Sequence, residues 1–428
     1  MKTAKAEKIK QTLKETKERR ENQVCRVYQL KLQNLSKKDI EKLDRLFLEA
    51  KWLRNFVVAD IENRIKDYKY KEVEIKTPEG FDKREIKLLS SQMKQEIIDQ
   101  IKDDLKSLKK SKEKGNKVGK LKFKSEVRTI PLKQYGVTYK ISGDRNRVKV
   151  QGIKKKFRVL GLHQIPENAE ITKGYLIKKP SGYYLHIVCY LPKEEVEREI
   201  REKQIQQPVG IDLGIKHQLT LSTGEKLSWY IPETKRLKRL QKILSRKQKG
   251  SRNYQKVKKE IGKEWEYIYN KRQDALNKAI SCLKRFSLIA VQDDSIEGWK
   301  KGLFGKQIQN TGIGGVTARL RSLATLISVF FVDRYEPTTQ TCSFCGYRQE
   351  ISLSERVFKC EGCGIEIDRD VNSAREILKV AIELLLWMLR IIENGGEGKL
   401  LKILPVDGGE VTPVERGISL VEAGSPSL

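Results

Sequence analysis

The feature that most restricts how this chain can fold is a pair of Cys-x-x-Cys motifs. Cys342 and Cys345 form the first motif, Cys360 and Cys363 form the second, and fourteen residues separate them. Four thiolates in two such pairs suit tetrahedral Zn²⁺, because each pair supplies two ligands from one side of the metal. A site with four protein ligands leaves no coordination position open, so the zinc is expected to be structural.

The other cysteine and glycine positions bear on the same motifs. Gly346 and Gly364 follow the second cysteine of each motif, where a tight turn favours a residue that tolerates positive φ. Redox pairing of these cysteines is the alternative to a metal site. Three further cysteines are scattered, at positions 25, 189 and 282. Such an odd, sparse set is typical of a protein in the reducing cytosol and not of a disulfide framework.

Charge indicates the kind of partner. The chain has 428 residues with 88 Lys and Arg against 56 Asp and Glu, so its net charge is +32. This excess requires a polyanion, and nucleic acid fits best. An anionic membrane fits less well, because no basic helix has a strongly apolar opposite face. The most apolar stretch, near residue 380, contains Glu383 and Arg390, and the first twenty residues have no apolar core. Neither a transmembrane helix nor a signal peptide is therefore expected, and the cytoplasm is the expected location.

Two stretches concentrate the positive charge. Residues 101–124 hold ten Lys against three acids, and residues 235–259 hold twelve Lys and Arg and no acid. Leucine and isoleucine at helical spacing in the second stretch predict one packed and one cationic helix face. The candidate phosphate contacts are Lys117, Lys120, Lys122, Lys124, Arg239, Arg246 and Lys249. Any one of them taken alone is better explained as a solvated surface residue, whereas a run without balancing acids favours phosphate contact. Phe123, Tyr135 and Phe157 have two interpretations, base stacking or core packing.

Acidic residues gather at the ends of expected strands and at the start of an expected helix. They are Asp212, then Asp293 with Asp294, then Asp368 with Asp370. Carboxylates arranged in this way are typical of a nuclease that holds two Mg²⁺ ions, which prefer hard oxygen ligands. Gly210 and Gly214 flank the first aspartate and predict space for a phosphate to approach the strand. Taken alone, Asp212 could equally be a turn or surface residue.

At these residues the chain resembles the TnpB family, insertion-sequence-encoded RNA-guided endonucleases related to compact type V CRISPR effectors. The resemblance covers most of the chain and follows the family's order. Its carriers are KVGKLKFKSEVRTIPLKQYG, GIDLGIKHQLTLSTGEK, SRKQKGSRN, EPTTQTCSFCG and IDRDVNSAREIL, with a final EAGSPSL that is also similar to the family.

The resemblance implies an α+β multidomain fold. A β-barrel wedge domain with a helical recognition insertion is expected first, followed by an RNase H-like (RuvC) α/β nuclease domain with an inserted zinc ribbon. The expected segments are 1–22, a basic extension; 23–34 and 117–205, the wedge domain; 35–116, the recognition domain; 206–338 and 367–394, the nuclease domain; 339–366, the ribbon; and 395–428, a tail rich in Gly, Pro and Glu that is expected to be disordered.

The resemblance also implies roles for the acids. Asp212 matches the family's first catalytic carboxylate, and Asp370 matches its last. The middle position departs, because Gln292 stands where the family has Glu, and an amide carries no charge to bind Mg²⁺. Asp294 lies two residues further on, and in a strand residues i and i+2 share a face, so it is expected to replace that carboxylate. Glu297 is the other candidate if the strand ends early.

Three functional hypotheses follow. The first is an RNA-guided DNA endonuclease with structural Zn²⁺ and catalytic Mg²⁺, whose partners are a guide RNA and double-stranded DNA with a short flanking motif. The second is a nuclease-impaired protein that binds DNA through its guide and acts as a roadblock or regulator. The third is a zinc-ribbon nucleic-acid-binding protein that uses no guide. Gln292 and Asp294 separate the first two, and a co-purifying small RNA separates both from the third.

Overall fold

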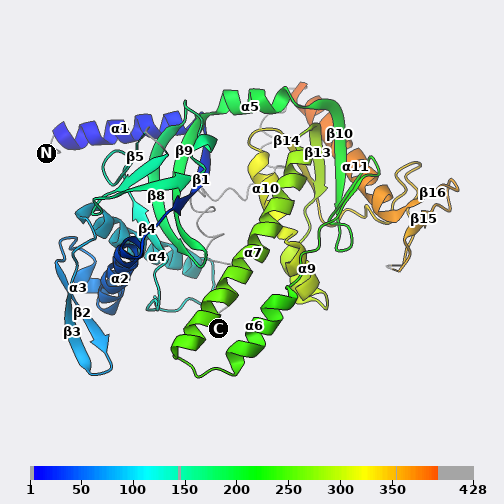
Figure 1. The fold of residues 1–428 in the computed structure, drawn as a ribbon. Helices are drawn as coiled ribbons and strands as arrows, with labels where there is room; N and C mark the ends of the chain where they lie inside the picture. The colour runs from blue at the N-terminus through cyan, green and yellow to red at the C-terminus, as the bar shows by residue number, and fades with distance from the viewer. Residues whose placement is uncertain (1–3, 143–145, 353, 394–428) are drawn as a thin grey trace. The chain divides into compact units, whose positions relative to one another are not determined.

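The computed structural model describes residues 4–142, 146–352 and 354–393. The described residues form two compact units, one that ends at Pro192 and one that begins at Lys193 (Figure 1). None of the helices within these ranges is long and apolar enough to cross a membrane. The tail expected from residue 395 lies outside the described residues.

The first unit is built on a curled, antiparallel half-barrel sheet of seven strands in the order β4-β8-β9-β1-β7-β6-β5. The strand β1 (Gln23–Gln33) follows helix α1 (Ala4–Glu21) and lies in the middle of the sheet, where Val27 pairs with Val188 and Lys31 with Leu160. The other strands are β4 (Thr129–Leu132), β5 (Tyr139–Ser142), β6 (Arg147–Val150), β7 (Lys156–Leu160), β8 (Glu170–Lys179) and β9 (Gly182–Pro192). The first strand of the chain is therefore joined to strands more than a hundred residues away.

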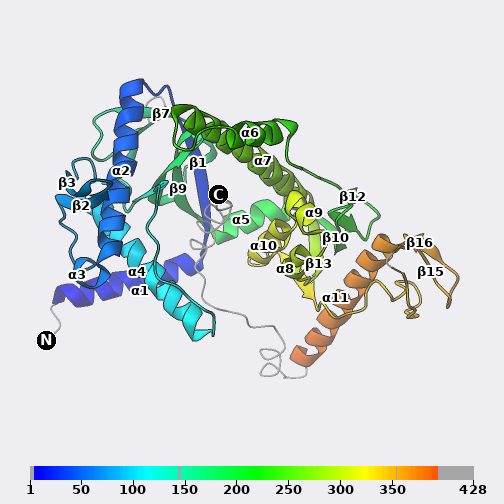
Figure 2. The same cartoon turned by 90° about the horizontal axis from the view of Figure 1, so that it is seen from below.

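A mostly helical insertion separates β1 from the rest of the half-barrel. It comprises α2 (Lys37–Ala59), α3 (Ile61–Arg64), the hairpin β2 (Glu72–Thr77) and β3 (Gly80–Glu85), and α4 (Ser91–Glu113) (Figure 2). Ser36 and Asp39 form a capping box that begins α2. The hairpin was not expected from the sequence, because its residues are mostly charged and exposed and only Val73 is fully buried.

The second unit is built on a mixed five-stranded sheet in the order β12-β11-β10-β13-β14. The strands are β10 (Ile205–Leu213), β11 (Leu219–Leu221), β12 (Lys226–Leu227), β13 (Phe286–Gln292) and β14 (Ser328–Val332). β10, β13 and β14 run parallel, whereas β11 pairs antiparallel with both β10 and β12. The carboxyl ends of the three parallel strands consequently share one edge of the sheet.

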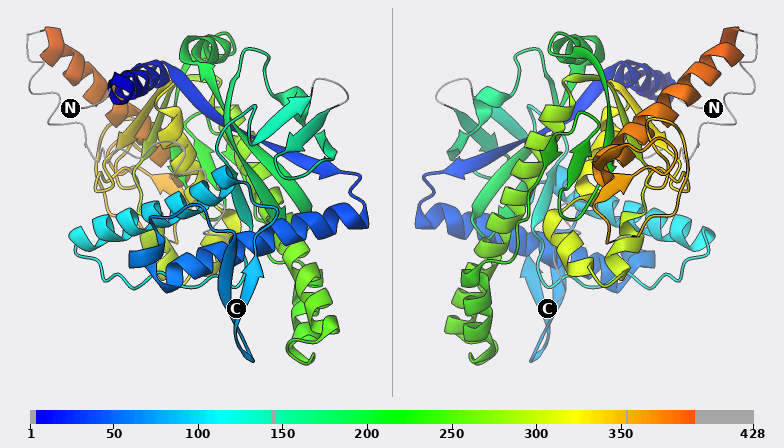
Figure 3. Two further views of the ribbon diagram at one scale, coloured as in Figure 1. Left: turned by 90° about the vertical axis from the view of Figure 1, so that its left-hand side faces the viewer. Right: turned by 90° about the vertical axis from the view of Figure 1, so that its right-hand side faces the viewer.

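Helices cover both faces of this sheet (Figure 3). Helices α7 (Arg252–Leu283) and α10 (Gly314–Leu323) pack on the face of Val209, Ile289 and Val291. Helix α11 (Arg369–Glu393) packs on the face of Ala290 through Ile377 and Ala381. The remaining helices of the unit are α5 (Lys193–Arg201), α6 (Lys235–Ser245), α8 (Ile296–Lys301) and α9 (Gly305–Thr311).

Gly210 allows α11 to lie directly against β10. A Cβ atom at this position would lie 1.9 Å from the carbonyl oxygen of Ala374, so any side chain would collide with the helix backbone. At Gly214 a Cβ atom would lie 2.6 Å from the carbonyl oxygen of His217. The expectation that these glycines leave room for phosphate is therefore wrong, because the chain itself fills the space beside each of them.

The Gly210 contact predicts that an added methyl group destabilises the protein at residue 210 but not at residue 302. Gly210→Ala should destabilise the protein by about 2 kcal/mol, since the helix backbone must move to accept the methyl group. Gly302→Ala is the matched control, because a Cβ atom there meets only the Trp299 carbonyl at 3.5 Å, an ordinary contact. Thermal unfolding of both variants checks this, and equal midpoints for the two would contradict it.

Candidate metal centres

Three separate elements of the second unit bring Asp212, Asp294 and Asp370 together. Ile211 pairs with Val291, so Asp212 on β10 lies one residue beyond that pair, beside the end of β13. Asp294 follows β13 by two residues, and Asp370 lies in the first turn of α11. All three side chains are partly exposed, and the charges of Asp370 and Asp294 both act on Asp212.

The cluster concentrates negative charge. Burial, followed by the charges of Asp370 and Asp294, raises the pKa of Asp212 to about 8, against the opposing effects of Ser373 and Arg369. Burial and the charge of Asp293 likewise raise the pKa of Asp294 to about 6. A bound cation would relieve this repulsion, and carboxylate oxygens are the ligands that Mg²⁺ prefers. The cluster therefore fits divalent metal ions.

Neighbouring acids that looked equivalent in the sequence have other partners. Asp293 forms an ion pair of 2.6 Å with Arg321. Asp368 pairs with Lys226 at 2.7 Å and accepts hydrogen bonds of 3.1 Å from the backbone N–H groups of residues 370 and 371, so it caps α11. Glu297 lies exposed in the first turn of α8. Asp293 and Asp368 are thus held by close ion pairs, whereas Asp370 has a longer ion pair of 3.5 Å with Arg369.

Strand alternation does not explain the position of Asp294. The strand β13 ends at Gln292, and beyond it the N–H of Asp294 turns back to donate to the Gln292 carbonyl at 3.0 Å. The expectation that residues 292 and 294 share a strand face is wrong for this reason. It is the turn after the strand that brings Asp294 within electrostatic reach of Asp212.

Sequence reasoning missed two residues of the same helix turn. The Ser373 hydroxyl donates to Asp212 Oδ1 at 3.3 Å. Asn372 Nδ2 donates to the Thr341 carbonyl at 2.8 Å, and its Oδ1 accepts from the Ser343 N–H at 2.9 Å. Both lie in the RDVNSA segment, and the three-residue spacing between Asp370 and Ser373 was the available signal, since it places them on one face of a helix.

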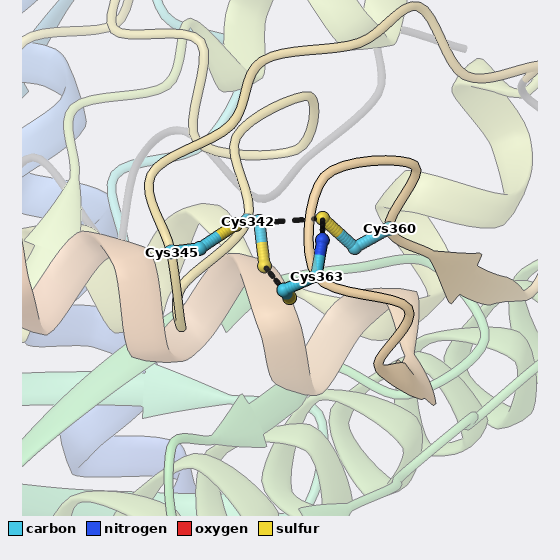
Figure 4. A group of neighbouring side chains, drawn as sticks. All are labelled: Cys342, Cys345, Cys360 and Cys363. Atoms are coloured by element: carbon cyan, nitrogen blue, oxygen red, sulfur yellow. Dashed lines mark hydrogen bonds between the residues drawn. The ribbon is translucent and has the colours of Figure 1, made fainter.

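The four cysteines lie at the tips of two facing turns (Figure 4). Their sulfur atoms all lie within 4.8 Å of one another, and the pairs Cys342–Cys363 and Cys345–Cys360 are 3.8 and 3.5 Å apart. Tetrahedral Zn–S bonds of ~2.3 Å would place the sulfur atoms about 3.8 Å apart. The cluster is therefore compatible with structural zinc.

The backbone around the cysteines has the expected form. Gly346 and Gly364 have φ values of 78° and 73°, and their N–H groups donate to the carbonyls of Cys342 and Cys360 at 2.9 Å. The strands β15 (Val357–Lys359) and β16 (Glu366–Asp368) complete this segment around the buried Phe358. Among the described residues, only these cysteines gather closely enough to surround a single ion, so the three aspartates form a wider arrangement.

The candidate phosphate contacts fall in both units. In the first, Asn55 on α2 exchanges two hydrogen bonds of 2.9 Å with the backbone of Lys124, which anchors an irregular segment. In the second, Leu237 is buried against α7, so α6 has the expected packed and cationic faces. The exposed candidates are Lys117, Lys120, Lys122, Arg239, Arg246 and Lys249, while Lys124 is partly exposed.

The aromatic candidates have different environments. Phe157 is 1% exposed and belongs to the core of the half-barrel. Tyr135 packs edge-on against Tyr139, with ring centroids 5.4 Å apart. Phe123 is 64% exposed within the segment that carries the lysines. Core packing therefore accounts for Phe157 and Tyr135, and base stacking remains a hypothesis for Phe123.

Comparison with known protein families gives two matches in the second half of the chain. Residues 190–293 match OrfB_IS605, described as a probable transposase. Residues 322–377 match the Cas12f1-like TNB domain. The two segments contain the end of the half-barrel, strands β10 and β13, the four cysteines and the start of α11.

Curated relatives resemble part of the chain. "Putative RNA-guided DNA endonuclease" of Streptomyces pristinaespiralis is 32% identical over 51% of this chain and 55% of its own. "Putative RNA-guided DNA endonuclease InsQ" of Escherichia coli K12 is 33% identical over 40% of this chain and 48% of its own. "TnpB-like protein L79" of Acanthamoeba polyphaga mimivirus is 24% identical over 47% of this chain and 41% of its own. The chain thus spans about half the length of the curated relatives it matches.

A solved structure is also similar. A chain from a cryo-EM structure of a Cas12f1–sgRNA–target DNA complex matches with a TM-score of 0.42 and 14% identity, and the match covers 79% of this chain and 82% of that chain. The family models and the curated relatives indicate the same kind of protein, since their names refer to insertion-sequence transposases, TnpB-like proteins and RNA-guided nucleases. The resemblance to TnpB proteins that the sequence motifs indicate is therefore confirmed.

Proposed function

We propose that this protein is an RNA-guided DNA endonuclease whose second unit hydrolyses DNA phosphodiesters. One observation carries the proposal: Asp212, Asp294 and Asp370 converge from three elements, and burial together with the charges of Asp370 and Asp294 raises the pKa of Asp212 to about 8. Such a cluster is unfavourable without a cation, and a pair of metal ions held by carboxylates is a general solution for phosphodiester hydrolysis. The names of the curated relatives support the same activity.

The proposed organisation follows the family order. Residues 23–34 and 117–205 would form the wedge domain, and residues 35–116 the recognition domain. Residues 206–338 and 367–394 would form an RNase H-like nuclease domain, with the zinc ribbon at 339–366. The mixed sheet, covered by helices on both faces and bearing acids at its carboxyl edge, supports the nuclease assignment.

In this proposal Asp212, Asp294 and Asp370 would hold Mg²⁺. The bound ions would activate water and stabilise the leaving oxygen. The chain's own contribution is to keep the three carboxylates in place: Ser373 orients Asp212, and Asp368 caps the helix turn that carries Asp370. The candidate phosphate contacts of the two basic stretches, residues 101–124 and 235–259, would hold the phosphates of a guide RNA and its double-stranded DNA target, while a short flanking motif in the DNA would be read separately.

A second candidate function is guided DNA binding without cleavage. Gln292 favours it, because the side chain that replaces the family's Glu is buried and uncharged. In that case the protein would occupy its target as a roadblock or regulator. The two candidates share every partner and differ only in whether the aspartate cluster performs hydrolysis.

The first prediction separates the acids of the cluster. With guide RNA, Mg²⁺ and a matching plasmid, Asp294→Ala should reduce cleavage at least about a hundredfold, as should Asp212→Ala and Asp370→Ala, because each removes a metal ligand. Glu297→Ala is the matched control, since this exposed acid begins α8 and should tolerate the change with cleavage intact.

The outcomes distinguish the candidate functions. Cleavage by the wild type that survives Asp294→Ala but not Glu297→Ala would move the ligand to residue 297. A wild type that binds guide and target in a mobility-shift assay without cutting would establish the second candidate function. Wild-type cleavage that persists in Asp212→Ala would overturn the proposed site.

The second prediction concerns zinc. The purified protein should contain about one Zn²⁺ per chain, and Cys342→Ser combined with Cys360→Ser should remove it, because both of these buried thiolates would be ligands. Proteolysis should then cut between residues 339 and 366. Elemental analysis checks the metal content, and Cys282→Ser, outside the cluster, is the control. Wild-type protein without zinc would refute the assignment.

The third prediction concerns RNA. A small RNA should co-purify from the native locus, and its affinity should fall at least tenfold between 50 and about 200 mM salt, because bound phosphates displace counterions. Replacing Lys117, Lys120 and Lys122 by Ala should weaken binding and flatten the salt dependence. Replacing Lys14, Lys66 and Lys87 by Ala is the control, because these three lysines are also exposed but lie outside the two basic stretches. Affinity independent of salt, or no bound RNA, would favour a protein that uses no guide.

A further inference from the structure

The side-chain amide of Gln292 is fully used within the protein. Its Nε2 lies 3.1 Å from the carbonyl of Asp333, 3.4 Å from that of Arg334 and 2.8 Å from that of Glu336. The side chain is only 9% exposed. Three carbonyl oxygens around one nitrogen fix which way the amide points, and a carboxylate in the same place would offer no proton to any of them.

The amide oxygen begins a chain of contacts that ends at Asp212. Gln292 Oε1 accepts from the Thr338 hydroxyl at 3.0 Å, and Thr338 Oγ1 lies 3.3 Å from Ser373 Oγ. Ser373 Oγ in turn donates to Asp212 Oδ1 at 3.3 Å. Thr338 and Ser373 are each 1% exposed, so no bulk water competes for these groups.

The number of hydroxyl protons determines which group donates and which accepts in this series of hydrogen bonds. A hydroxyl has one proton, and Thr338 gives its own to Gln292, so it can only accept from Ser373. The Ser373 proton therefore has two acceptors, Thr338 and Asp212, and Asp212 is the stronger one once a bound metal keeps its carboxylate ionised. Ser373 Oγ therefore lies between two acceptors, 3.3 Å from Thr338 Oγ1 and 3.3 Å from Asp212 Oδ1, and Gln292 holds the first of these in place.

We propose that Gln292 is a positioning residue, which fixes the Asp212 carboxylate for metal through Thr338 and Ser373 and holds the 333–336 backbone with the same amide. An amide performs both tasks, since its oxygen accepts from Thr338 while its two N–H protons are shared among the three carbonyls. Gln292 then has a positioning role in this site, at the position where the family has a glutamate that binds metal. The inference rests on the proposed function, because it assumes that Asp212 binds a divalent ion.

The test measures Mn²⁺ binding to the zinc-loaded full chain without nucleic acid, by electron paramagnetic resonance of free Mn²⁺. Thr338→Val removes the link but keeps the amide bonds to the loop, and it should weaken Mn²⁺ binding about tenfold. Thr338→Ser should restore it. Thr325→Val is the matched control, because the hydroxyl of Thr325, ahead of the amino end of β14, donates to the Ser322 carbonyl at 2.9 Å and should leave Mn²⁺ affinity unchanged.

Gln292→Glu supplies the sharpest contrast. It should also weaken Mn²⁺ binding about tenfold, despite the added carboxylate, because the new charge faces three carbonyl oxygens. The Mg²⁺ concentration for half-maximal cleavage should rise in parallel. A variant that merely loses stability would unfold at lower temperature with unchanged Mn²⁺ affinity below its transition, and that result for Thr338→Val would overturn the inference.

Asp212→Ala separates failure of this inference from failure of the proposed function. If Asp212→Ala binds Mn²⁺ as well as the wild type does, the aspartate cluster is no metal site and the proposed function fails. If Asp212→Ala loses Mn²⁺ while Thr338→Val and Gln292→Glu match the wild type, the metal site stands and the positioning role is wrong. Tighter Mn²⁺ binding by Gln292→Glu would also overturn it, since residue 292 would then be a vacant ligand position.

Discussion

The second unit depends on the close approach of α11 to β10 at Gly210. With no side chain there, the helix backbone at Ala374 rests directly on the strand. One turn of helix then serves several purposes. Asp370 joins the carboxylate cluster, Asn372 holds the segment before the first cysteine pair, and Ser373 reaches Asp212. Any movement of this turn would change all three contacts together, so its position on the strand is the main geometrical constraint on the candidate site.

The basic and the acidic side chains of the protein occupy different kinds of position. The net charge of +32 comes mainly from exposed Lys and Arg. Their contacts with a polyanion do not require an exact geometry. The aspartate cluster is the reverse: a few partly exposed acids whose mutual repulsion is offset only weakly by Arg369. Acids next to them in the chain, Asp293 and Asp368, are already paired with Arg321 and Lys226. Asp370 also has an ion pair, of 3.5 Å with Arg369, so pairing alone does not distinguish the cluster from the acids beside it.

Local chemistry was predictable from the residues themselves, whereas individual contacts between distant segments were not; the gathering of Asp212, Asp294 and Asp370 was expected only from the family resemblance. The positive φ of Gly346 and Gly364, the Ser36 cap and the packed face of α6 depend on residues a few positions apart. The role of Gly210 depends on Ala374, far along the chain, and appeared in the sequence only as a flexible position. Likewise Gln292 looked like a lost carboxylate, because its partners at 333–338 and Ser373 meet it only in the folded unit. The hairpin β2–β3 was missed because charge obscured its alternation.

The two hydrogen bonds of Asn372 have a thermodynamic consequence. They join the segment ahead of the first cysteine pair to the helix turn that carries Asp370 and Ser373. A ligand that orders the segment ahead of the cysteines reduces the entropy lost when the helix turn is later ordered. The reverse holds equally, because such coupling between two sites is reciprocal. Metal held by the thiolates and metal held by the carboxylates would then favour each other through a single amide side chain, without any ligand in common.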